Sequence, residues 1–183
     1  MTGNAVFQVP APVMRYEHNI LHDSYCRQEV AGIFTTAGVL RYEFFGDDYV
    51  YLPESEYSGI SGCIITHRHR SGYPFSSHDI LESSRLMVHE MRVVTSTTVY
   101  SLKAGTRGWP DPIVTAAILR DVERSGIYRW HAYHIRKQFR CPAGSCPPAA
   151  VCLMRETFLR LSAGALGLVF AKGSWAECPG DYR

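Results

Sequence analysis

Two histidines separated by one residue, His67 and His69, end an apolar run typical of a β-strand. Residues i and i+2 of a strand point to the same side, so both imidazoles can lie on one face at the strand end. Neutral imidazole binds Zn²⁺, and a catalytic zinc ion typically has three protein ligands and one water. Asp79, in the first turn of an expected helix, is the nearest candidate for the third ligand. Such a set leaves one position for a water molecule, which zinc acidifies toward neutral pH.

Two further residues could complete a hydrolytic site. Glu29 lies where a polar stretch passes into an apolar strand, and it could act as the base near the water. Ser76, at the start of the expected helix, could donate a hydrogen bond to a developing oxyanion. A structural interpretation also exists, in which Ser76 is a helix N-cap, Asp79 interacts with the helix dipole, and the histidines are incidental. The N-cap interpretation of Ser76 is compatible with the functional one.

These residues resemble the motif of the JAB/MPN+ (JAMM) zinc metallopeptidase family, which consists of a Glu at the first strand, His-x-His, a short loop and Ser-x-x-Asp. All five positions are filled, by Glu29, His67, His69, Ser76 and Asp79. The resemblance implies one zinc ion per chain, bound by the two histidines and the aspartate. It also implies that Glu29 is the general acid/base and that Ser76 supports the tetrahedral intermediate.

The loop between the motif's histidines and its serine departs from the commonest family pattern. Six residues separate His69 from Ser76, one fewer than is commonest, and Arg70 stands where a proline is frequent. This pattern is more similar to bacterial and phage-related JAB proteins than to eukaryotic deubiquitinases. The resemblance therefore implies a protein or peptide substrate, with conjugates of ubiquitin-like modifiers included among the expectations.

The composition limits the other function classes. The chain has 183 residues and a formal net charge of +2, and that length suits one domain with a sizeable core. The sequence has no strongly basic stripe, so nucleic acid is not an expected partner. No secretory signal is recognised, and the longest apolar stretch, residues 161–171, is too short to span a bilayer. We therefore expect a cytoplasmic protein without a membrane partner.

Other residues that can bind metal do not form a comparable motif. Cys141 and Cys146 have four residues between them, as in zinc ribbons, but Cys152 and Cys178 do not form a matching pair. Reduced thiols are expected in the absence of a signal peptide. Two histidine pairs at helical spacing could contact a metal or a substrate but are interpreted as parts of amphipathic helices: His18 with His22, and His131 with His134.

The periodicity of apolar residues predicts the elements that must position the motif. Strands are expected at 29–36, 39–45, 62–67, 91–95 and 98–102, and helices at 13–27, 77–88, 113–140 (divided or kinked at Gly126) and 150–168. In the helix at 77–88, Ile80, Leu81 and Met87 are expected to face inward. Residues 54–59 are expected to form a loop near the cleft. The glycines of the last helix suggest a stop near Ser162, then a strand at 166–171 and a surface loop from Gly173.

This order of elements predicts an α+β fold or an α/β/α sandwich, not a regularly alternating parallel sheet. The resemblance implies a JAB/MPN-like (cytidine-deaminase-like) α/β/α sandwich with a mixed central sheet and extra C-terminal helices. The expected organisation is a lead-in at 1–12, a catalytic core at 13–105, and a helical extension packed on the core at 106–183.

The first functional hypothesis is a zinc-dependent hydrolase that cleaves a peptide or isopeptide bond. Two alternatives stay open: a non-catalytic JAB-like binding or assembly module, and a JAB protein linked to DNA transactions. Non-catalytic JAB-like modules usually lack one or more of the metal ligands, whereas this sequence keeps all of them. The second finds no support in the near-neutral net charge.

Overall fold

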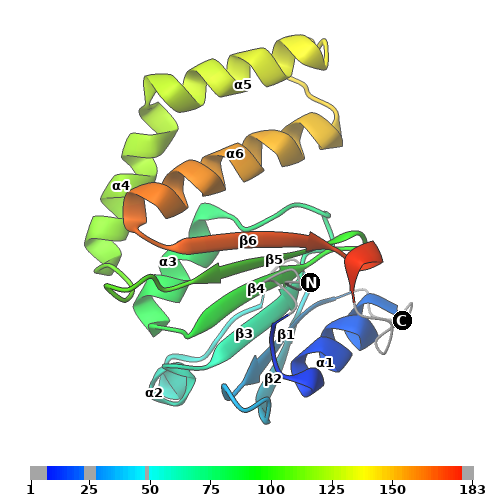
Figure 1. Ribbon diagram of the computed structural model, residues 1–183, viewed down its shortest axis with the longest axis vertical. Helices are drawn as coiled ribbons and strands as arrows, with labels where there is room; N and C mark the ends of the chain where they lie inside the picture. Colours follow the sequence, from blue (N-terminus) through cyan, green and yellow to red (C-terminus); the bar gives the residue numbers. More distant parts are fainter. Residues whose placement is uncertain (1–7, 23–27, 48–49, 179–183) are drawn as a thin grey trace.

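A six-stranded mixed sheet forms the centre of the protein (Figure 1). The computed structural model describes residues 8–22, 28–47 and 50–178. The strands are β1 (Glu29–Phe34), β2 (Leu40–Gly46), β3 (Ile64–Arg68), β4 (Glu90–Val94), β5 (Thr98–Lys103) and β6 (Val169–Ser174). Their order in the sheet is β2-β1-β3-β4-β5-β6, and all neighbours are antiparallel except β3 and β4, which are parallel.

Helices cover both faces of this sheet. They are α1 (Ala11–His22), α2 (Tyr57–Ile60), α3 (Ser77–Leu86), α4 (Pro112–Arg124), α5 (Gly126–Gln138) and α6 (Pro148–Leu166), with short 3₁₀ helices η2 (Glu54–Glu56) and η3 (Trp175–Glu177). Helix α1 packs on one face, whereas α3, α4 and α6 contribute side chains to the main core on the other. The predicted α+β class with a mixed central sheet is confirmed.

The alternation of side chains along β3 and β4 separates two chemically different faces. Ile65 and His67 point to the face that carries α3, together with Met91 of β4. Thr66 and Arg92, which are register partners, point to the face that carries α1. Because helices cover both faces, all five residues of β4 are buried, although two of them are charged.

A buried ion network joins α1 to the back of β3 and β4. The Arg92 guanidinium, which is fully buried, donates to both carboxylate oxygens of Glu17 at 2.6 and 3.0 Å and to Glu90 at 2.6 Å. Thr66 and Ser101 donate to the same two carboxylates at 2.7 Å each. Every charge in the network therefore has an opposite charge at hydrogen-bond distance, and each carboxylate also accepts from a hydroxyl, which is the condition for burying ions at a tolerable free-energy cost.

The C-terminal segment differs from the prediction at two points. Helix α6 does not stop near Ser162 but continues to Leu166, because Leu159, Ala163 and Leu166 are buried in the main core. Gly167 ends it with a left-handed φ of 70°. The predicted strand follows as β6 but extends to Ser174, so Gly173 belongs to a sheet strand and not to a surface loop.

Other boundaries are correct to within a few residues, with three differences. Met87 does not face inward: it ends α3 with φ of 50° and is 60% exposed. The segment expected as a loop at 54–59 contains η2 and most of α2. The first predicted helix ends at His22 within the described residues, and positions 23–27 lie outside them. The division at Gly126 is confirmed, since Ser125 ends α4 and caps α5.

No helix in the described part of the chain combines the length and the apolar character needed to cross a bilayer.

Candidate functional site

The end of β3 and the start of α3 bring three potential zinc ligands to one point. The Nε2 atoms of His67 and His69 are 3.0 Å apart. The Oδ1 atom of Asp79 lies 3.3 Å from Nε2 of His67, and its Oδ2 atom lies 3.6 Å from Nε2 of His69. Nitrogen or oxygen ligands about 2.0 to 2.1 Å from a tetrahedral zinc ion are about 3.3 Å from one another. The three side chains therefore fit a zinc ion in both chemistry and spacing.

Backbone contacts hold His69 on the same side as His67, although β3 ends at Arg68. The amide of His69 donates to the Val94 carbonyl at 3.1 Å, which continues the pairing with β4 beyond the end of the strand. The Nδ1 atom of His69 lies 2.9 Å from the Tyr73 carbonyl oxygen. Because a carbonyl only accepts, Nδ1 must carry the proton, and Nε2 is left with a lone pair that can bind a metal.

The third ligand is held by a capping box at the start of α3. Ser76 donates to Oδ2 of Asp79 from its backbone amide at 2.6 Å and from its hydroxyl at 2.8 Å. The Asp79 amide donates back to the Ser76 hydroxyl at 3.2 Å. The structure thus places Ser76 as an N-cap that orients the carboxylate, with its hydroxyl proton directed to Asp79. Its predicted contact with an oxyanion stays a prediction.

The electrostatics at Asp79 and His69 favour the protonation states that a metal requires of these two side chains. Burial alone would raise the pKa of Asp79, but the hydrogen bond and charge of His67, together with His69 and the Ser76 amide, hold it well below its usual range. Burial, and the neighbouring His67, lower the pKa of His69. At neutral pH the carboxylate is therefore ionised and the His69 ring is neutral.

A cleft of about 380 Å³ contains the three ligands and Glu29. Glu29 comes two residues before Ala31, the register partner of His67, so its side chain lies on the same face of the sheet. Burial raises the pKa of the Glu29 carboxyl, and the Asp79 charge adds to this, whereas His67 and the Arg70 amide act in the opposite direction. A carboxyl with a raised pKa beside a metal site is suited to accept and return a proton.

The cleft walls include residues that the motif did not predict. His78, Glu82 and Arg85 of α3 line one wall, and Glu54 and Tyr57 of the connection between β2 and β3 also contribute to the lining. The spacing of 78, 82 and 85 places them on one face of α3, so the helical periodicity contained a signal for them. His78 lies on the wall and outside the ligand group.

A second, larger groove of about 590 Å³ runs between α3 and α4. It is lined largely by apolar atoms, and Ile113 of α4 is strongly exposed beside it. His78 and Arg85 line both cavities, so the groove is a neighbour of the cleft.

Within the described residues, His67, His69 and Asp79 form the one group of three or more side chains able to hold a metal ion. Five described cysteines are free thiols: Cys63, Cys141, Cys146, Cys152 and Cys178. The rings of His18 and His22 contact each other, and the His131 and His134 rings contact Trp130. Comparisons with models of protein families, with curated proteins and with solved structures found no match for this chain.

Proposed function

We propose that this protein is a zinc-dependent hydrolase that cleaves a peptide or isopeptide bond, and that its sheet and flanking helices form a JAB/MPN-like fold. One observation carries the proposal: three ligand atoms lie at the spacing of a zinc ion, with an additional, half-buried carboxyl, Glu29, in the same cleft. The JAMM-type motif assigns the same residues to these roles. A structural zinc site would be closed by a fourth protein ligand, and this donor set has three.

The roles of the residues follow from their placement. Bound to His67, His69 and Asp79, a zinc ion would supply acidification of a water molecule and polarisation of the substrate carbonyl. Glu29 accepts the proton of the attacking water and passes it to the leaving amine, for which its raised pKa is suited. Ser76 keeps Asp79 oriented. The cleft walls orient the substrate chain and limit the access of bulk water to the reacting atoms.

The first experiment measures the zinc content of the purified protein by elemental analysis. We expect about one equivalent per chain in the wild type, loss of zinc in Asp79→Ala, and retention in Glu82→Ala. Glu82 is a matched control because it is a carboxylate of the same helix and the same cleft but lies outside the ligand group. A wild type that stays free of zinc after reconstitution would refute the proposed metal site.

The second experiment separates catalysis from metal binding. Glu29→Gln should retain zinc and lose hydrolysis of a peptide library and of isopeptide-linked conjugates, because it removes the base and leaves the ligands. Full activity in this variant would refute the role of Glu29. Zinc at one equivalent without hydrolysis in the wild type would instead favour the non-catalytic binding or assembly module.

A further inference from the structure

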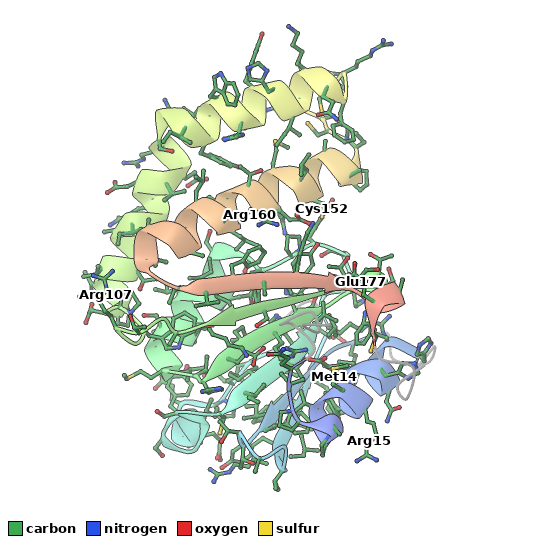
Figure 2. The ribbon with its side chains drawn as sticks, viewed as in Figure 1. Met14, Arg15, Arg107, Cys152, Arg160 and Glu177 are labelled. Carbon is green, nitrogen blue, oxygen red and sulfur yellow. The ribbon has the colours of Figure 1, made fainter. Side chains whose placement is uncertain are left out.

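Helix α5 is the element farthest from the sheet, and no other described element covers its outer face (Figure 1). It packs on the molecule through its inner face, where Ile135 is buried and the Tyr128 ring contacts the Phe158 ring of α6 at 5.7 Å between centroids. The opposite side chains project away from the rest of the protein (Figure 2). The exposed residues of α5 include two large aromatics, Trp130 at 58% and Tyr133 at 61% exposure.

The charge of the protein is concentrated in the helices around this face. Residues 112–166, which comprise α4 to α6, contain eight Arg and Lys and three Asp and Glu, a formal charge of +5. The whole chain carries +2, so the remaining residues together carry −3. Helix α5 itself contains Arg129, Arg136 and Lys137 and no acidic residue. Among the ion pairs of the described residues, none includes these three cations.

The cations and aromatics of α5 alternate around its outer face and do not form separate stripes. At about 100° per residue, Trp130 lies about 20° from Lys137, and Tyr133 lies about 40° from Arg129. A helix that lies on a membrane surface instead has one apolar face and one charged face. Alternating cations and aromatic rings are the arrangement that binds the phosphates and the unpaired bases of a nucleic-acid strand.

We propose that the outer face of α5 binds single-stranded nucleic acid. Arg129, Arg136 and Lys137 contact phosphates, and Trp130 and Tyr133 stack on bases. The helix has 13 residues and is about 20 Å long, which corresponds to about six nucleotides at a rise of about 3.4 Å each. This binding is independent of the proposed hydrolysis, since no residue of α5 lines the cleft.

The test uses the full-length protein and a fluorescein-labelled 20-nucleotide oligo(dT), with binding followed by fluorescence anisotropy at several NaCl concentrations. The wild type should bind with an affinity that falls as salt rises. Neutralising Arg129, Arg136 and Lys137 together, each to Gln, should reduce the slope of log K against log salt by about 2, at about 0.7 per phosphate contact. Trp130→Ala should weaken binding about tenfold and leave this slope unchanged.

A matched control removes three cations elsewhere: Arg15, Arg41 and Arg107, each to Gln. Figure 2 shows Arg15 and Arg107 far from α5. This variant should keep the wild-type slope, and circular dichroism should show that every variant is folded. Absence of binding at 50 mM NaCl would overturn the proposal, as would an equal loss in the control or a preference for duplex DNA of the same length. Binding to vesicles of phosphatidylcholine and phosphatidylserine, or to an acidic peptide, without binding to oligo(dT) would also overturn it.

Discussion

Replacing Ser76 with Ala tests whether this residue orients a metal ligand. The Ser76 hydroxyl makes two contacts with Asp79: it donates to Oδ2 at 2.8 Å and accepts from the amide at 3.2 Å. The variant loses both, although the backbone amide of residue 76 can still donate to Oδ2. The loss of an N-cap lowers the free energy of unfolding by about 1 kcal/mol. For a chain of this length, 183 residues, that corresponds to a decrease in Tm of about 3 °C.

The effect on zinc separates an orienting residue from a simple cap. Loss of a group that orients a ligand lowers metal affinity by about 10 to 100-fold, which equals about 1.4 to 2.8 kcal/mol of binding free energy. The affinity is measured by competition with a chromophoric chelator. Ser125→Ala is the matched control, because Ser125 caps α5 by accepting from the Tyr128 amide at 3.1 Å and has no contact with the site.

We expect both variants to lose similar stability and only Ser76→Ala to lose zinc affinity. If Ser76→Ala bound zinc as tightly as Ser125→Ala, the orienting role would be wrong. If zinc affinity were unchanged but hydrolysis fell by more than about tenfold, the predicted contact of Ser76 with the oxyanion would be favoured instead.

Three further predictions concern the base, the buried network and the end of α3. Burial raises the pKa of Glu29, and a base acts only when it is deprotonated. In a pH–rate profile, kcat/KM should therefore fall as pH decreases through that raised pKa. A fall that begins only at or below pH 4.5 would contradict this prediction. Glu17→Ala leaves the Arg92 guanidinium buried without its main partner, so urea unfolding should show a loss of about 3 to 5 kcal/mol, whereas exposed Glu43→Ala should change little. Met87→Gly should stabilise the protein by about 1 kcal/mol, since Met87 has φ of 50° and an exposed side chain; a decrease in Tm would show that Met87 has a packing role.

The parts of the fold that were predictable from sequence are those set by local periodicity. Alternation in β3 placed His67 with Ile65 on one face, and the Ser76 to Asp79 spacing placed both at a helix start. The end of α6 was not predictable in this way, because burial of Ala163 and Leu166 in the main core outweighs the low helix propensity of Gly164.

Several determinants of the site depend on the path of a loop or on contacts between residues distant in sequence. The Tyr73 carbonyl fixes the tautomer of His69 because the conformation of the loop brings it close to the ring. No periodic sequence pattern predicts that conformation. The network around Arg92 joins residues up to 75 positions apart. The net charge of the whole chain was also a poor guide to the charge of its parts, since a total of +2 conceals the basic character of α4 to α6.

Strand β3, which carries the proposed zinc ligand His67, is supported from both sides, and the helical C-terminal segment takes part in that support. Behind the strand, Glu17 of α1 accepts from Thr66, the neighbour of His67. In front, Tyr73 contributes its carbonyl to His69, and the Arg155 guanidinium of α6 lies 4.4 Å from the centre of the Tyr73 ring. A cation–π contact of this kind restricts the loop that carries the carbonyl. Helix α6 therefore connects the basic segment α4 to α6 with the position of His69, a proposed zinc ligand. Changes in the packing of α6 should alter metal affinity at a smaller perturbation than is needed to change the sheet.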